Sequence, residues 1–258
     1  MTLLLDESMI GMLESWLWPF FRVAGLLMAA AVVGTRSVPV RIRLVLAIAI
    51  TLALVPVIPM TQYQEPFTAT WLMTSIQQVL IGVAMGLTIR TIFVALEIVG
   101  QAIGQLMGLM MAAMVDQQNG NQVPIVGQFY LLFATLLFLS VDGHLMMVSA
   151  LAMSFHALPV GSGGIARESA WLVVDWVGSI LSTAVLIALP AIVSLLIVNM
   201  AFGVMTRAAP QLNIFAVGFP VMIILGVFVI LFTLDGFFPH MTSLFEASFA
   251  MIERMLER

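Results

Sequence analysis

Long apolar segments alternate with short polar stretches along the chain, and each apolar segment is expected to form a helix. Most of them reach the roughly 17 to 25 residues that a helix needs to cross the hydrocarbon core of a bilayer. The pattern therefore predicts an all-α integral membrane protein with about six apolar helical segments. These segments cover residues 12–33, 42–58, 71–100, 129–155, 171–205 and 214–238.

Most of these segments contain a charged residue or a proline, so several are expected to be kinked or broken. Pro19 and Arg22 lie inside the first segment, and Pro190 lies in the middle of the fifth. An arginine in lipid costs about 3 kcal/mol, so Arg22 either faces protein or water or extends towards an interface. Asp142 and His144 break the fourth segment, and both side chains are expected to be satisfied in the interior. One explanation for such irregular spans is that they pack mainly against protein in a large oligomer.

The third segment carries two informative pairs of residues. Gly82 and Gly86 are four residues apart and let another helix backbone approach closely. Arg90 and Glu97 share one helical face, but they are seven residues apart and too distant for a simple pair. Each is therefore expected to meet a partner elsewhere, either as an ion pair between helices or as part of a proton relay.

The stretch from residue 100 to residue 128 combines a face of small residues with a face of methionines. Small residues recur every four positions, starting at Gly100, and could continue the third segment as one long or bent helix. After Asp116 the chain becomes polar and glycine-containing. Two interpretations stay open: a tightly packed membrane helix followed by an ordinary loop, or a pliable element with a mobile loop. The two faces comprise Gly100, Gly104, Gly108 and Ala112, and Met107, Met110, Met111 and Met114.

Features near the two ends of the chain predict its orientation and a further helix. The loop at residues 34–43 holds three arginines and no acidic residue, which places it in the cytoplasm and the acidic N-terminus outside. The N-terminus lacks the basic region of a signal peptide, so the first apolar segment is expected to be retained. The C-terminal tail is amphipathic. Its apolar positions are Phe245, Phe249, Ile252, Met255 and Leu256.

The composition strengthens the membrane prediction and excludes several function classes. Hydrophobic residues make up 62% of the chain and charged residues 9%, against about 25% charged residues in an average soluble domain. There is no cysteine, and the basic residues are all arginines that are too scattered to form a nucleic-acid surface. The phosphate-loop, HExxH and GxSxG motifs are missing, and His144, His156 and His240 lie in unrelated contexts. No enzyme activity, cofactor or metal site is expected.

Several stretches together resemble one known family. They are RSVPVRIR at residues 36–43, GQAIGQLMG running into MVDQQNGNQVP at 100–124, LLFLSVDGHLMMVSALAMSF at 136–155, and Arg207 with PQLNIFAVGFP at 210–220. In content and order they resemble the FliR family of the flagellar protein export apparatus and its counterpart in virulence type III secretion. The resemblance covers nearly the whole chain.

The resemblance implies a fold, an assembly and a location. The fold would be a FliP-like part, at about residues 1–170, fused to a FliQ-like helical hairpin with the amphipathic tail, at about residues 171–258. Members of the family are non-enzymatic core subunits of the flagellar type III export gate. The chain would assemble with FliP and FliQ in the bacterial inner membrane, within the flagellar basal body and next to FlhB and FlhA. Unfolded flagellar proteins would pass through that gate.

The resemblance also implies roles for particular residues. In this family a loop projects into the central pore as a plug, and the matching positions are Met107, Gly108, Met110, Met111, Met114 and Asp116. Thioether side chains seal by apolar contact and re-pack around varied chains. Gly82, Gly86, Gly100 and Gly104 would serve helix packing. Candidate contacts to partner subunits are Arg90, Glu97, Arg207, Gln211 and Asn213.

Two other functions compete with the export gate. A secondary transporter or small channel would use Arg90, Glu97, Asp142 and Asp235 as intramembrane polar groups. It predicts two related halves, and residues 1–128 show no convincing repeat in residues 129–258. A purely structural membrane scaffold is the other alternative. Recovery with two other small multi-helical proteins would favour the gate subunit over the transporter.

Overall fold

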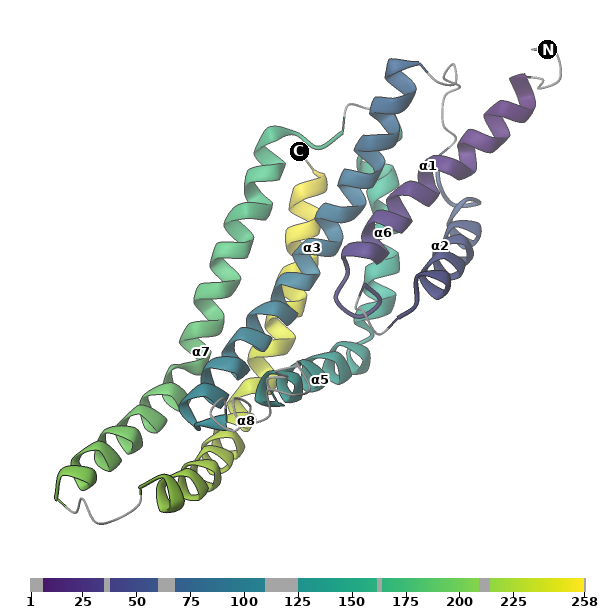
Figure 1. The fold of residues 1–258 in the computed structure, drawn as a ribbon. Helices are drawn as coiled ribbons and strands as arrows, with labels where there is room; N and C mark the ends of the chain where they lie inside the picture. The colour runs from purple at the N-terminus through teal and green to yellow at the C-terminus, as the bar shows by residue number, and fades with distance from the viewer. Residues whose placement is uncertain are drawn as a thin grey trace. The chain divides into compact units, whose positions relative to one another are not determined.

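The computed structural model describes residues 7–34, 38–59, 68–109, 125–161, 164–208 and 214–257, and its regular secondary structure is helical (Figure 1). The prediction of an all-α membrane protein is confirmed. The helices are α1 (Glu7–Ala29), α2 (Val40–Leu54), α3 (Ala69–Leu106), α5 (Ile125–Ser140), α6 (Gly143–Ala157), α7 (Arg167–Ala208) and α8 (Ile214–Leu256).

Three helices are longer than a simple membrane span. The third apolar segment and the first half of the glycine series form one helix, α3, of 38 residues, as predicted. α7 runs for 42 residues through Pro190, and α8 for 43 residues through Pro220 and Pro239. The amphipathic tail is the end of α8, and its five apolar positions are all buried. At 1.5 Å per residue, each helix is about 57 Å long or more, against about 30 Å of hydrocarbon.

The fourth apolar segment breaks where the sequence predicted. α5 ends at Ser140, α6 begins at Gly143, and Asp142 between them adopts a left-handed backbone with φ of 56°. Aspartate tolerates this conformation better than most residues. The expected burial of the two polar groups is wrong for this chain, because Asp142 and His144 are both exposed.

Within the described residues, α3 and α7 are each long and apolar enough to cross a membrane. The pair α5 and α6, and the two parts of α8 on either side of Asp235, pass the same test if each bent pair counts as one span. α2 has 15 residues and is shorter than the span expected at residues 42–58.

The chain divides into two compact units, each drawn from separate parts of the sequence. Unit 1 contains residues 1–91, 142–178 and 245–258, and unit 2 contains residues 92–141 and 179–244. The predicted FliP-like and FliQ-like parts are consecutive along the chain, and that division stays a prediction.

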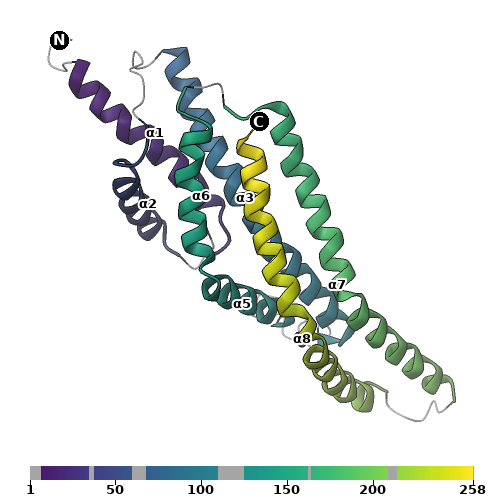
Figure 2. The same cartoon turned by 180° about the vertical axis from the view of Figure 1, so that it is seen from behind.

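Each unit has its own buried core. In unit 1, α1, α2 and α6 lie close together in both views of the ribbon (Figures 1 and 2), and Trp18, Phe155 and Phe245 are almost fully buried. In unit 2 an aromatic cluster joins α3, α5 and α8. The rings of Phe93 and Phe138 have centroids 5.6 Å apart, and those of Tyr130 and Phe237 have centroids 5.1 Å apart, both in edge-on geometry.

Candidate functional site

The C-terminal end of α3 is where the predicted plug segment begins, and a glycine ends the helix there. Gly108 has φ of +79°, a backbone conformation that favours glycine. Its N–H donates to the carbonyl of Gln105 at 3.0 Å, and the N–H of Met107 donates to the carbonyl of Ile103 at 3.0 Å. This arrangement uses carbonyls that a helix terminus otherwise leaves unpaired.

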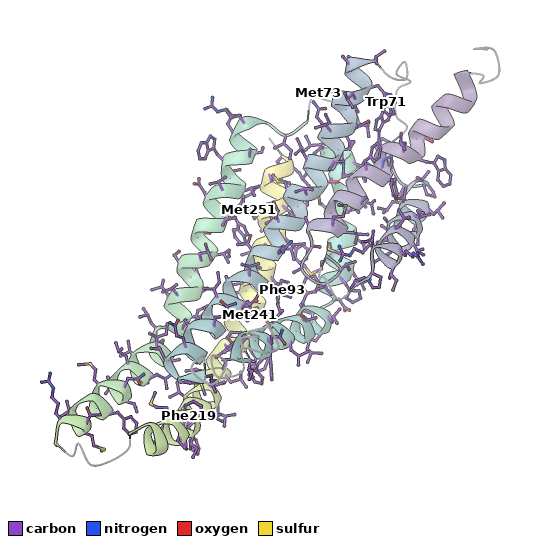
Figure 3. All side chains as sticks on the ribbon, viewed as in Figure 1. Trp71, Met73, Phe93, Phe219, Met241 and Met251 are labelled. Atoms are coloured by element: carbon purple, nitrogen blue, oxygen red, sulfur yellow. The ribbon has the colours of Figure 1, made fainter. Side chains whose placement is uncertain are left out.

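Side chains from α7 and α8 hold this end of α3 within unit 2. Asn199 of α7 donates its side-chain N–H to the carbonyl of Leu106, the last residue of α3, at 3.0 Å. Met107 is 2% exposed and occupies the space beside Gly226, where an added Cβ would lie 2.6 Å from the methionine sulfur. A Cβ on Gly108 would lie 3.5 Å from the ring of Phe219, which is labelled on α8 in Figure 3. The start of the predicted plug is therefore fixed to two other helices of the same chain.

Met107 and Gly108 are the only predicted plug residues that the described part of the chain includes. Met107 packs inside unit 2 instead of lying on the surface of the chain. The other predicted positions, Met110, Met111, Met114 and Asp116, lie outside the described residues.

Two of the predicted packing glycines bring α5 against α3. A Cβ added to Gly100 would lie 2.6 Å from the Cα of Gly127 and 2.8 Å from the carbonyl oxygen of Val126. A Cβ added to Gly104 would lie 3.3 Å from the Cγ2 of Val126, and one added to Gly127 would lie 3.0 Å from the carbonyl oxygen of Glu97. The backbones of the two helices touch because both contact positions lack side chains.

Gly82 and Gly86 occupy the corresponding positions between α3 and α1 in unit 1. A Cβ on Gly82 would lie 2.8 Å from the backbone nitrogen of Leu26, and one on Gly86 would lie 2.7 Å from the Cβ of Ala29. From the other side, a Cβ on Gly25 would lie 2.7 Å from the carbonyl oxygen of Val79. Side chains at these glycines would push the two helices apart.

This close approach encloses Arg22, which is completely buried. Its Nε donates to the Oε1 of Gln78 at 2.8 Å, and its Nη2 donates to the same oxygen and to the carbonyl of Leu158 at 2.8 Å. Its Nη1 donates to the carbonyl of Ser154 at 2.7 Å and to the Ser154 hydroxyl at 3.0 Å. The guanidinium also lies 4.1 Å from the centre of the Phe155 ring.

These contacts decide between the two interpretations of Arg22. Its five N–H groups all have acceptors within protein, so the side chain does not extend towards an interface. Sequence reasoning missed its partners. Gln78 was detectable, because it precedes Gly82 by four residues on the face of α3 that packs on α1. Ser154 and the carbonyl of Leu158 carry no such signal.

The remaining candidate residues lie apart from these contacts. Arg90 is exposed, and Glu97 is half-buried and accepts a hydrogen bond from the Nε2 of Gln101 at 3.3 Å. Arg207 is exposed in the last turn of α7, where a positive charge suits the helix dipole. Gln211 and Asn213 lie outside the described residues. In the part of the chain that is described, no three histidine or acidic side chains gather as a metal site.

Comparison with known proteins gives consistent results over nearly the whole chain. Residues 13–248 match the family of bacterial export proteins, family 1. The chain is 37% identical over 224 residues to the flagellar biosynthetic protein FliR of Escherichia coli K12, covering 86% of this chain and 85% of that protein. It is 35% identical over 250 residues to FliR of Pectobacterium carotovorum, covering 96% and 95%. It is 30% identical over 252 residues to FliR of Aquifex aeolicus, covering 98% and 96%.

Proposed function

Because the chain belongs to the FliR family of the bacterial export proteins, we propose that it forms the export gate of the flagellar apparatus with FliP and FliQ and supplies its plug. The chain is a membrane-associated, non-enzymatic component of the flagellar protein export apparatus. The proposal adds the identity of the partners, the plug and the location in the inner membrane at the flagellar basal body. FlhB and FlhA would lie nearby.

The anchored end of α3 is the observation that carries the plug proposal. A plug that moves aside needs a fixed base, so that opening changes the plug and leaves the rest of the gate in place. Asn199, Gly226 and Phe219 supply such a base around Met107 and Gly108. Met107 would then belong to the base, and the methionines that follow would form the seal.

The chemistry of the seal follows from the methionines that come after this base. A closed gate must hold back ions and water, and an open gate must admit unfolded chains of unrelated sequence. Thioether side chains are apolar and flexible, so they exclude water and adapt to each passing side chain. Met110, Met111 and Met114 are spaced to lie together on one helical face, and the polar segment after Asp116 would let that face move.

Replacing the three sealing methionines tests the proposal directly. The Met110→Ala, Met111→Ala, Met114→Ala triple variant is expected to raise ion leakage through the assembled gate while secretion of flagellar proteins continues. Met73→Ala, at an exposed position near the start of α3, is the matched control and should leave leakage unchanged. Unchanged leakage in the triple variant with normal secretion would contradict the sealing role. Co-expression with the neighbouring genes, followed by affinity purification, should recover two other small multi-helical proteins.

A further inference from the structure

An apolar groove of about 320 Å³ opens between α1 and α2 in unit 1. Its walls come from the middle of α1 and the second half of α2, and Trp16, Ile48 and Leu52 are each 45–48% exposed. The one hydroxyl in its lining, that of Thr51, donates to the carbonyl of Ala47 at 2.7 Å and is buried. The groove is lined by Trp16, Leu17, Phe20, Ile48, Thr51 and Leu52.

A stripe of exposed side chains leads from this groove to a single arginine. Leu44 and Val45 are 51% and 66% exposed, and they lie one turn before Ile48 on the same face of α2. Arg41 lies two turns before Ile48 on that face and is exposed. Arg43 points elsewhere, because its Nε donates to the carbonyl of Val38 at 3.1 Å.

The start of α2 is suited to bind an anion. Its first turn contains no acidic residue, and Pro39 at its N-cap makes no side-chain capping bond. The backbone N–H groups of Ile42 and Arg43 donate to the carbonyl of Pro39 at 3.0 and 3.3 Å. The N–H groups of Val40 and Arg41 and the positive end of the helix dipole therefore add to the charge of Arg41. The positive-inside rule places this end of α2 at the cytoplasmic leaflet, which is rich in anionic lipids.

We propose that the α1–α2 hairpin binds an anionic phospholipid, with its phosphate at Arg41 and one acyl chain along the stripe and into the groove. Arg41 and Leu52 are eleven residues apart, which is about 16 Å along a helix. One leaflet contributes about half of the 30 Å hydrocarbon core, or about 15 Å. The length of an acyl chain thus matches the distance from the charge to the far end of the groove.

A lipid fits this surface better than a helix of another protein. The groove follows only residues 48–52 of α2, little more than one turn, whereas packed helices interlock over several turns. The proposal does not depend on the plug, since all of its residues lie between positions 16 and 52.

The test compares retained lipids after reconstitution of the full chain with its co-expressed partners. Vesicles of phosphatidylcholine with a minor fraction of phosphatidylglycerol, both carrying the same acyl chains, serve as the lipid source. Native mass spectrometry of the re-extracted complex then measures the ratio of the two lipids. The unmodified protein should be enriched in phosphatidylglycerol, and Arg41→Gln should lower that enrichment about fivefold, as expected for one arginine at a membrane surface.

Two further variants separate the headgroup contact from the groove. Arg167→Gln removes an exposed arginine from the first turn of another helix, α7, and should leave the enrichment unchanged. Ile48→Trp fills the groove and should lower retention of phosphatidylglycerol, whereas Leu80→Trp, at an exposed position of α3, should not. Equal retention of both lipids by the unmodified protein, or equal effects of Arg41→Gln and Arg167→Gln, would overturn the proposal. An Ile48→Trp variant with normal retention would refute the acyl-chain site.

Discussion

Arg22 shows how a single charged residue can be accommodated inside an apolar helix. Its guanidinium lies at the C-terminal end of α6 and donates to the carbonyls of Ser154 and Leu158. The Ser154 carbonyl also accepts the backbone N–H of Leu158 at 2.9 Å. The helix dipole is negative at that end and favours a positive charge. The same side chain holds Gln78 of α3, so one residue joins three helices of unit 1.

Replacing Arg22 is therefore expected to destabilise the chain strongly. Arg22→Ala removes both donors to the buried Oε1 of Gln78 and one donor to the part-buried carbonyl of Leu158, and each buried acceptor left without a donor costs about 1–3 kcal/mol. Ser154 keeps the backbone N–H of Leu158 as a partner. The free energy of unfolding should fall by about 3 kcal/mol or more, measured by denaturant titration of the purified protein in detergent. Arg90→Ala, on the exposed side of α3, should change it by no more than about 0.5 kcal/mol. A similar loss in both variants would show that the buried contacts are not responsible.

The contact of Arg22 with α3 could be predicted from the sequence, but its contacts with α6 could not. An arginine in an apolar segment demands partners, and the four-residue spacing of Gln78, Gly82 and Gly86 marks one face of α3. The contacts with Ser154 and Leu158 join residues 132 and 136 positions apart. They depend on how α6 packs beside α1, and no local periodicity encodes that packing. The same holds for Asn199, whose partner Leu106 is 93 positions away.

At the scale of helices, the ends were harder to predict than the helices themselves. α3 continues through Gly100 and Gly104 because the apolar pattern of the third segment continues through them. Both glycines pack against α5. The junction between the last apolar segment and the tail contains Asp235, Gly236 and Pro239, which are typical of a break. α8 bends by 56° at this junction and then continues to Leu256, because a proline removes one hydrogen bond and bends a helix without having to end it.

The termination of α3 at Gly108 gives a prediction for this scale. Gly108→Ala places a side chain in a left-handed conformation, at a cost of about 1–2 kcal/mol, which weakens the anchored base of the proposed plug. The variant should raise ion leakage through the gate and lower the thermal midpoint of the purified protein. Gly108→Asn is the matched control, because asparagine tolerates this conformation, and it should come closer to the unmodified protein in both measurements. Equal effects of alanine and asparagine would argue that space beside Phe219, and not backbone conformation, is what matters there.

For the molecule as a whole, the exposed surface of α7 indicates that lipid alone does not cover the chain. Side chains project from α7 along its length (Figure 3). Only 28% of the most apolar 18-residue stretch of this helix is buried. Large exposed apolar residues run from Trp171 to Met205, about 51 Å along the helix. The hydrocarbon core covers about 30 Å, so the remaining apolar surface needs protein. The long exposed stretch on α7 is the physical counterpart of the irregular spans in the sequence, and it supports the proposed hetero-oligomeric gate.

The outer face of α7 is therefore expected to contact partner subunits. Leu186 and Ile197 are 64% and 62% exposed and lie three turns apart on one face. Truncating both to alanine should weaken association by about 2 kcal/mol or more, which is more than tenfold, because each loses buried methyl groups at an interface. Quantitative recovery of co-expressed partners with the tagged chain measures this effect. The chain's own unfolding midpoint should hardly change, since both residues are exposed within it. Leu72→Ala, 57% exposed on α3, tests the specificity of the loss. Undiminished recovery from the double variant would place the partners on another face.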